Sequence, residues 1–142
     1  MAAECIDDVS IVTNAKCATP PMKPSYMTET PHHIGLIHWA KTQPILSDYL
    51  IHIPNGGYRH PREAQKLKKM GVKAGVSDLF LAYPNTHYHG LWIEIKSPNG
   101  KLSPEQKTWL GLMATVGYAT HVSRSLEETF DILQAYFTEL KK

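Results

Sequence analysis

Apolar residues recur at about every third or fourth position in four segments of the chain, and this spacing predicts four helices. The first helix spans about residues 29–41 and ends before Pro44, because proline interrupts a helix. The second spans about residues 61–71, and the third about residues 103–117. The fourth begins after Ser125 and continues towards the end of the chain.

Between these helices lie four short segments that are apolar or alternate between apolar and polar residues, a pattern typical of strands. They cover about residues 48–54, 78–82, 90–96 and 118–124. The predicted order of elements is α-β-α-β-β-α-β-α, without an internal repeat. This order favours a mixed α/β domain in which helices flank a central sheet.

The third helix has the most explicit start signal. Ser103 suits the N-cap, Pro104 suits the first helical position, and Gln106 completes a capping box. A second capping box, Ser125 with Glu128, opens the final helix. The spacing predicts a buried stripe on the third helix, formed by Trp109, Leu112, Met113 and Val116. The residues expected to face the core from the final helix are Phe130, Leu133, Phe137 and Leu140.

The composition limits the class of protein. A chain of 142 residues has room for one core, which we place at 28–142, and the proline-rich segment 1–27 is expected to be a flexible arm. No apolar run approaches the ~20 residues of a membrane span, so we expect no membrane partner. Only Cys5 and Cys17 are present, which excludes a disulfide framework and favours a reducing, cytoplasmic location.

The net charge of +2 is unevenly distributed along the chain. Residues 58–73 contain six basic residues and only one acidic residue, a local net charge of +5. Such a concentration favours a surface that faces phosphate groups, although a solvated helix face is an equally simple interpretation. The six basic residues are Arg59, Arg62, Lys66, Lys68, Lys69 and Lys73.

Two charged residues interrupt the apolar strand at 90–96. Glu94 and Lys96 lie two positions apart and therefore point to the same face of the sheet. If the strands form a hairpin with its apex near Thr86, Asp78 lies opposite Glu94, since both are eight residues from the apex. Two carboxylates at this place suit Mg²⁺, although Glu94 and Lys96 alone also fit an exposed cross-strand ion pair.

Taken in order, these motifs resemble the VRR-NUC domain of the PD-(D/E)xK nuclease superfamily. The resemblance spans roughly residues 29–136. It implies a restriction-endonuclease-like fold with a mixed central sheet. The matching segments are Trp39, Ile53-Pro54-Asn55-Gly56-Gly57 with Arg59, 71–78, Glu94-Ile95-Lys96, 103–106 with Trp109, and Gly117-Tyr118.

The resemblance also implies roles for individual residues. Asp78 and Glu94 become ligands of Mg²⁺ or Mn²⁺, and Lys96 becomes the catalytic lysine. Gln106 becomes a glutamine that reaches into the site, while the capping box explains the same residue without catalysis. In the first helix the family usually has a glutamate followed four residues later by a glutamine; this chain has Glu29 and His33 at those positions.

His33 is therefore expected to contact water or phosphate in place of the glutamine. The basic residues at 59–73, with Asn55, are expected to hold the DNA backbone, although Asn55 also fits a simple turn after a strand. The resemblance further implies a metal-dependent, structure-selective DNA endonuclease. It favours a homodimer acting on branched DNA such as Holliday junctions, in the cytoplasm of a bacterial or phage-infected cell.

Three other functions fit the same sequence. The first is a module that keeps the nuclease fold and binds DNA without cleaving it. The presence of His33 where the family usually has a glutamine favours it weakly. A flap nuclease or exonuclease, or a restriction-type nuclease, would keep the chemistry and change the substrate.

Overall fold

The computed structural model describes residues 29–55 and 59–138, so the predicted arm at 1–27 lies outside the described residues. The helices are α2 (Glu29–Ala40), α3 (Pro44–Tyr49), α4 (Pro61–Lys69), α5 (Pro104–Thr115) and α6 (Leu126–Thr138). The strands are β1 (Leu50–His52), β2 (Leu79–Leu81), β3 (Leu91–Ile95) and β4 (Ala119–Ser123).

The strands form one mixed sheet in the order β1-β2-β3-β4. The pairs β1–β2 and β2–β3 are antiparallel, whereas β3 and β4 are parallel. A parallel pair needs a crossover, and α5 provides it between β3 and β4. The predicted mixed α/β architecture, with helices flanking a central sheet, is therefore confirmed.

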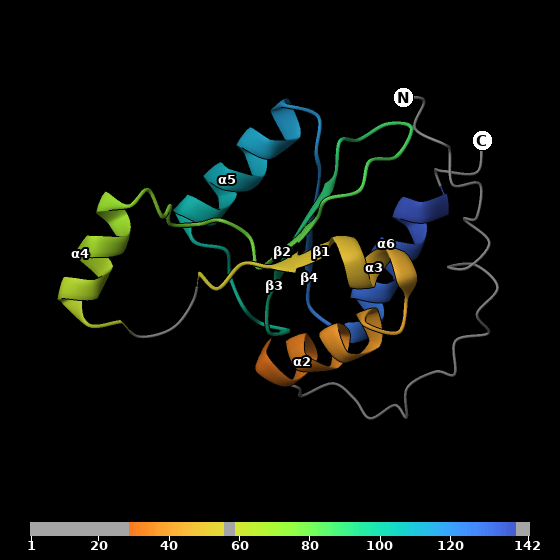
Figure 1. The fold of residues 1–142 in the computed structure, drawn as a ribbon, viewed down its shortest axis with the longest axis horizontal. Helices are drawn as coiled ribbons and strands as arrows, with labels where there is room; N and C mark the ends of the chain where they lie inside the picture. Colours follow the sequence, from red (N-terminus) through yellow and green to blue (C-terminus); the bar gives the residue numbers. More distant parts are fainter. Residues whose placement is uncertain (1–28, 56–58, 139–142) are drawn as a thin grey trace.

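The main core lies between one face of the sheet and the helices α2, α3 and α6 (Figure 1). The alternation predicted for β3 sends Leu91, Ile93 and Ile95 to this face, where each is at most 2% exposed. Leu133 and Phe137 of α6 are buried there as predicted, while Phe130 is partly buried and Leu140 lies outside the described residues.

Hydrogen bonds between buried polar side chains join α2, α6 and β4. The Oγ1 atom of Thr129 on α6 lies 2.9 Å from Nε2 of His32 on α2 and 2.6 Å from Oγ of Ser123 on β4. Because all three side chains are buried, these bonds fix the helical layer against the sheet.

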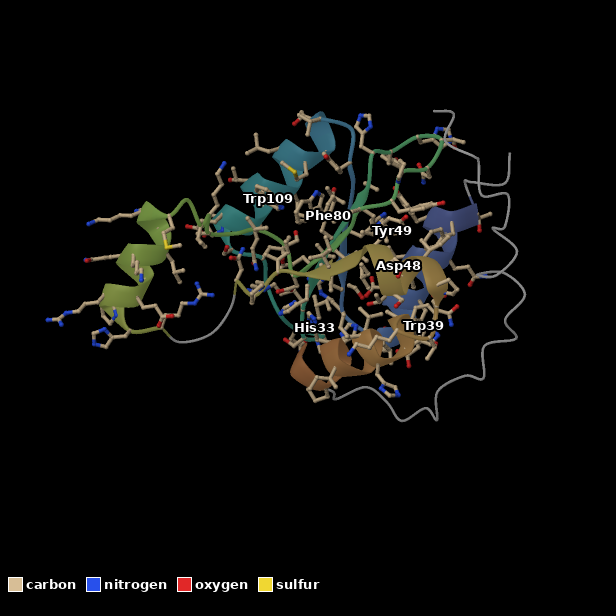
Figure 2. The ribbon with its side chains drawn as sticks, viewed as in Figure 1. His33, Trp39, Asp48, Tyr49, Phe80 and Trp109 are labelled. Atoms are coloured by element: carbon tan, nitrogen blue, oxygen red, sulfur yellow. The ribbon has the colours of Figure 1, made fainter. Side chains whose placement is uncertain are left out.

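The opposite face of the sheet carries an aromatic layer covered by α5. Phe80 stacks on Trp92 at 4.3 Å between ring centroids, and Trp92 meets Trp109 of α5 edge-on at 5.1 Å. Figure 2 shows Phe80 and Trp109 in this layer.

The prediction of a buried stripe along α5 is wrong, because none of its four members is fully buried. Leu112 and Val116 are 55% and 57% exposed, and only Trp109 and Met113 of the stripe are partly buried. Among the described elements, α5 is the only helix that covers this face of the sheet (Figure 1). It therefore has the sheet to pack against on one side and no second helix to cover its other apolar residues.

The strand predicted at 48–54 is wrong at its start. Pro44 begins the additional helix α3, which continues through Asp48 to Tyr49, and the strand is reduced to Leu50–His52. Pro44 occupies the first helical position, where its missing N–H is no loss, and Leu46 anchors the short helix in the core.

The helix α4 projects from the rest of the domain (Figure 1). None of its residues is buried, and Leu67 is the one that is partly shielded. Its start is capped by the ring of His60, which accepts a hydrogen bond from the backbone N–H of Arg62 at 3.3 Å. Within the described residues no helix is both long and apolar enough to cross a membrane.

Candidate active site

Asp78 and Glu94 lie opposite each other, as the sequence predicts. The ladder pairs Leu79 with Ile93, and extending this antiparallel register by one residue pairs Asp78 with Glu94. The Oδ2 atom of Asp78 accepts a hydrogen bond from the backbone N–H of Ile95 at 2.9 Å. This bond fixes the carboxylate of Asp78 to β3, next to Glu94.

Glu94 is a buried carboxylate, with only 1% of its side chain exposed. Its Oε1 atom lies 3.2 Å from Nζ of Lys96, which is 14% exposed. The same oxygen accepts a hydrogen bond from Nε2 of Gln106. An ionised carboxylate is stable at such a place only with partners of this kind.

Gln106 has two roles at once. Its Oε1 accepts from the backbone N–H of Ser103 at 2.9 Å, and the hydroxyl of Ser103 accepts from the backbone N–H of Gln106 at 3.2 Å. This is the predicted capping box of α5. The amide nitrogen of the same side chain donates to Glu94. The two explanations that the sequence left open for Gln106 are therefore compatible.

These side chains open onto a pocket of about 220 Å³. The residues that line it come from four places: the loop after β1, the segment before β2, the end of β3, and the start of α5. They are Asn55, Ala74, Gly75, Val76, Asp78, Glu94, Lys96, Ser103, Glu105 and Gln106.

Glu105 and Gly75 line this pocket although neither is singled out by the sequence. The backbone N–H of Glu105 and the Ser103 hydroxyl lower the pKa of the Glu105 carboxyl, which therefore stays charged. Gly75 has φ +83°, and a Cβ atom there would lie 2.4 Å from the backbone carbon of Glu105. Glycine suits this position because it adopts a positive φ without strain and has no Cβ atom, but no local signal in the sequence predicts the approach to α5.

Asn55 lines the pocket and also holds its wall in place. Its Nδ2 donates to the backbone oxygens of Val76 at 3.1 Å and Lys73 at 3.3 Å. The segment that leads into Asp78 is thereby tied to the end of β1. The amide group predicted to contact DNA is thus engaged with the protein backbone.

His33 lies near Asp78 from the side of α2. Its ring meets His52 edge-on at 4.2 Å, and Nδ1 of His52 lies 3.1 Å from the backbone oxygen of Asp78. Burial, and then the neighbouring His52, lower the pKa of His33, which favours its neutral form. Glu29 is the first residue of α2, and its side chain lies outside what the structure describes.

The predicted DNA-contacting basic residues do not gather in the pocket. Arg62, Lys66, Lys68 and Lys69 are exposed on the projecting helix α4. Lys73 lies beside the pocket in the segment that returns to the sheet. Arg59 is partly buried, and its Nη2 donates to the backbone oxygen of Pro54 at 2.6 Å.

The donor atoms of the pocket fit a hard divalent cation. Within the described residues, no group of three or more His, Cys, Asp or Glu side chains is arranged to hold a metal, which leaves Asp78 and Glu94 as the carboxylate pair. Mg²⁺ is typically held by one or two carboxylates, with water and substrate phosphate completing its ligands. Asp78, Glu94 and Lys96 have a formal net charge of −1, and Glu105, which also lines the pocket, adds a further negative charge, so the pocket suits a cation.

Comparisons with known proteins agree with this geometry. A family model of the VRR-NUC domain matches residues 33–126, which include Asp78, Glu94, Lys96 and Gln106. A solved structure of a "VRR_NUC domain protein" is 33% identical and superposes with a TM-score of 0.70. The alignment covers 83% of this chain and 93% of the other. No curated protein matches. The chain therefore belongs to the VRR-NUC family, which has a PD-(D/E)xK-like nuclease fold and a nuclease-type function.

Proposed function

We propose that this domain is a divalent-metal-dependent endonuclease that hydrolyses phosphodiester bonds in DNA, with Mg²⁺ or Mn²⁺ held by Asp78 and Glu94. The observation that carries the proposal is the burial of Glu94 directly opposite Asp78. Two carboxylates at one place repel each other, and the single positive charge of Lys96 offsets only one of them.

The residues around the carboxylates have separate tasks. When bound, the cation activates a water molecule and neutralises charge on the leaving oxygen. Gln106 holds the carboxylate of Glu94 through its amide, so that the position of the carboxylate depends on the start of α5. Lys96, 3.2 Å from Glu94, stabilises the negative charge that develops on the phosphate.

We propose branched DNA, such as a Holliday junction, as the substrate. The basic residues of α4 are suited to the phosphate backbone, which positions DNA without reading its sequence. Because α4 projects from the domain (Figure 1), its lysines can reach a duplex arm away from the arm that enters the pocket. This arrangement favours recognition of DNA shape.

We further propose that the enzyme acts as a homodimer. Resolution of a four-way junction requires cuts in two opposing strands, and each chain has one candidate site. A two-fold dimer matches a two-fold substrate and is the commonest symmetric oligomer. Light scattering on the full chain, free and bound to a junction, tests this: we expect the mass of two chains, and 16.0 kDa would contradict it.

The decisive test of activity is cleavage of labelled DNA by the full chain in Mg²⁺, Mn²⁺ or EDTA. The substrates are a four-way junction, a flap, a linear duplex and single-stranded DNA. We expect metal-dependent cleavage, fastest on the junction. Asp78→Asn should abolish it, since the amide can still accept from Ile95 but carries no charge.

The matched control is Asp48→Asn, which makes the same chemical change at an exposed position of α3. It should cleave at the wild-type rate. If the wild-type protein bound junctions but cleaved none of the substrates with either cation, the proposal would be wrong, and a non-cleaving DNA-binding module would replace it.

A further inference from the structure

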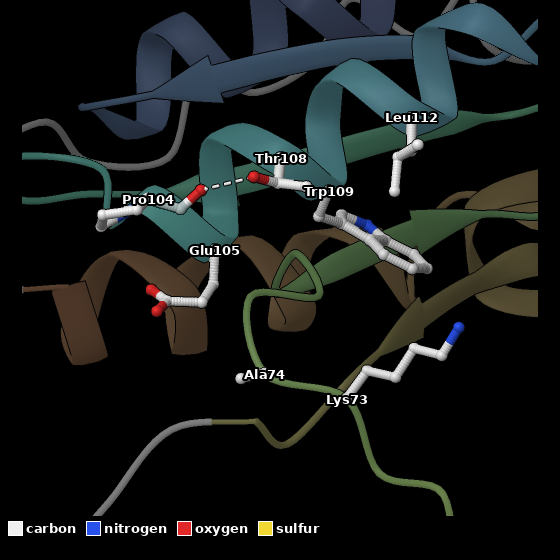
Figure 3. Close-up of a pocket in the computed structure, with 7 residues that line it drawn as sticks. All are labelled: Lys73, Ala74, Pro104, Glu105, Thr108, Trp109 and Leu112. Carbon is white, nitrogen blue, oxygen red and sulfur yellow. Dashed lines mark hydrogen bonds between the residues drawn. The ribbon is translucent and has the colours of Figure 1, made fainter.

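A second, mostly apolar groove lies next to the candidate active site. Its volume is about 360 Å³ (Figure 3). It shares Ala74 and Glu105 with the pocket that contains Asp78 and Glu94. The residues that line it are Lys73, Ala74, Pro104, Glu105, Thr108, Trp109 and Leu112.

The groove has an aromatic and aliphatic side provided by α5. Trp109 and Leu112 are one turn apart and both project towards the segment before β2 (Figure 3). The indole of Trp109 is held edge-on by Trp92 at 5.1 Å, so its orientation is set by the sheet. Leu112 remains 55% exposed, which leaves apolar surface open to a ligand.

The opposite side is provided by a segment whose backbone is held in place. Asn55 binds the backbone oxygens of Lys73 and Val76, and Gly75 approaches the start of α5 closely. Lys73 extends beneath the indole of Trp109 (Figure 3). The groove therefore combines a fixed aromatic ring with a cation, and it exists before any ligand binds.

This combination fits a nucleobase attached to its phosphate. Single-stranded nucleic acids are bound by aromatic side chains that stack on bases and by cations that contact the backbone. A base inside a duplex is already stacked on both sides, so an apolar groove of this kind is open only to an unpaired base. Because the groove and the catalytic pocket share Ala74 and Glu105, a base in the groove lies next to the phosphodiester bond that enters the pocket.

We infer that the groove lined by Trp109, Leu112 and Lys73 binds one unpaired nucleobase of the strand next to the phosphate that is cleaved. The inference rests on the proposed action on DNA and deepens it. It assigns to the domain a contact that selects branch points, where unpaired bases occur, over continuous duplex.

The test is equilibrium binding of the full chain to labelled branched DNA in EDTA, measured by fluorescence anisotropy. Each nucleotide within a few positions of the branch is replaced in turn by an abasic analogue. At one position we expect the wild-type protein to lose affinity by roughly 5- to 150-fold, the range for one base stacked on an aromatic side chain. Equal affinities across the whole scan would overturn the inference.

Leu112→Glu should bind the intact DNA as weakly as the abasic DNA and show no dependence on the base. Val116→Glu is the matched control, because it adds the same charge at the C-cap of the same helix, at a residue that is 57% exposed and does not line the groove. We expect Val116→Glu to retain the wild-type dependence. Trp109→Ala, checked by thermal melting, should behave like Leu112→Glu. Retained base dependence in Leu112→Glu would overturn the inference.

Because binding is measured in EDTA, where no metal-dependent cleavage occurs, the test of the groove is separate from the test of the proposed catalysis. Base-dependent binding without cleavage in Mg²⁺ would support the groove and contradict the nuclease proposal. Cleavage of junctions with equal affinities across the abasic scan would do the opposite. Failure to bind any of the DNA molecules in EDTA, together with failure to cleave them in Mg²⁺ or Mn²⁺, would overturn both.

Discussion

Gln106 donates a hydrogen bond from its amide nitrogen to the buried carboxylate of Glu94, while its amide oxygen accepts from the backbone N–H of Ser103. The start of α5 and the candidate metal ligand on β3 are thus connected by a single side chain. Three residues further along α5, Trp109 meets Trp92 on the same face of β3. The helix is therefore seated on the strand at two places, one polar and one aromatic.

The double role of Gln106 predicts that capping and catalysis can be separated. Ser103→Ala removes one capping bond and should lower the free energy of unfolding by about 1 kcal/mol with little loss of cleavage. Gln106→Ala should lower it comparably and also slow cleavage strongly, because the carboxylate of Glu94 loses the amide that holds it to the start of α5. Denaturant unfolding and single-turnover cleavage measure the two effects. Equal cleavage by both variants would show that the contact with Glu94 has no catalytic role.

Removing the charge of Lys96 should slow cleavage without weakening metal binding. In Lys96→Met, the carboxylates Asp78 and Glu94 lose a nearby positive charge, so their attraction for Mg²⁺ does not decrease. Calorimetry with Mg²⁺ and a cleavage assay on the same sample test this. A loss of Mg²⁺ affinity as large as that of Asp78→Asn would indicate a structural role for Lys96.

Neutralising the exposed lysines of α4 should weaken DNA binding in a salt-dependent manner. Each phosphate contact contributes about 0.9 to the slope of log affinity against log salt. The triple variant of Lys66, Lys68 and Lys69 to Gln should therefore reduce the slope by up to about 2.7. The same triple change should leave thermal stability nearly unchanged, since none of these residues is buried. An unchanged slope would leave α4 as a solvated helix without contact to DNA.

Two glycines allow backbone strain to be separated from close packing. Both Gly71 and Gly75 have positive φ, at +91° and +83°. An added Cβ meets nothing within 4 Å at Gly71 but lies 2.4 Å from the backbone of Glu105 at Gly75. Gly71→Ala should cost about 1 kcal/mol of stability from strain. Gly75→Ala should cost distinctly more and impair cleavage, as measured by denaturant unfolding and activity; equal costs would contradict the close approach.

The lowered pKa of His33 predicts a loss of stability in mild acid. Because burial favours the neutral ring, the unfolded chain takes up a proton near pH 6.5 before the folded protein does. This contribution is fully present above about pH 6.5 and is lost as the pH falls towards the lower pKa of the folded state. His33→Asn should reduce the decrease in unfolding free energy between about pH 7.5 and about pH 5.5.

The control for this pH effect is His38→Asn, an exposed position on the same helix. It should keep the wild-type pH dependence. Denaturant unfolding at several pH values, in EDTA, measures both variants. If His33→Asn lost stability with falling pH as steeply as the wild-type protein, protonation of His33 would not contribute.

Local signals in the sequence were sufficient for most of the elements. The capping box at Ser103 and Gln106 marks the start of α5, and the alternation along β3 assigns Ile93 to the core and Glu94 to the opposite face. The pairing of Asp78 with Glu94 follows from counting back from the hairpin apex. These features depend on neighbouring residues or on one turn, so periodicity and turn chemistry are enough to predict them.

Other features were decided only by tertiary contacts. The exposure of Leu112 and Val116 depends on how much of the sheet's second face a single helix can cover, which no periodicity records. The helix α3 exists because Leu46 finds a place in the core. Gln106 reaches Glu94 because α5 returns across the sheet above β3, and a contact between residues 12 positions apart, on different elements, depends on that packing. The sequence determined which side chains were available, and the packing of α5 on the sheet decided which of them meet.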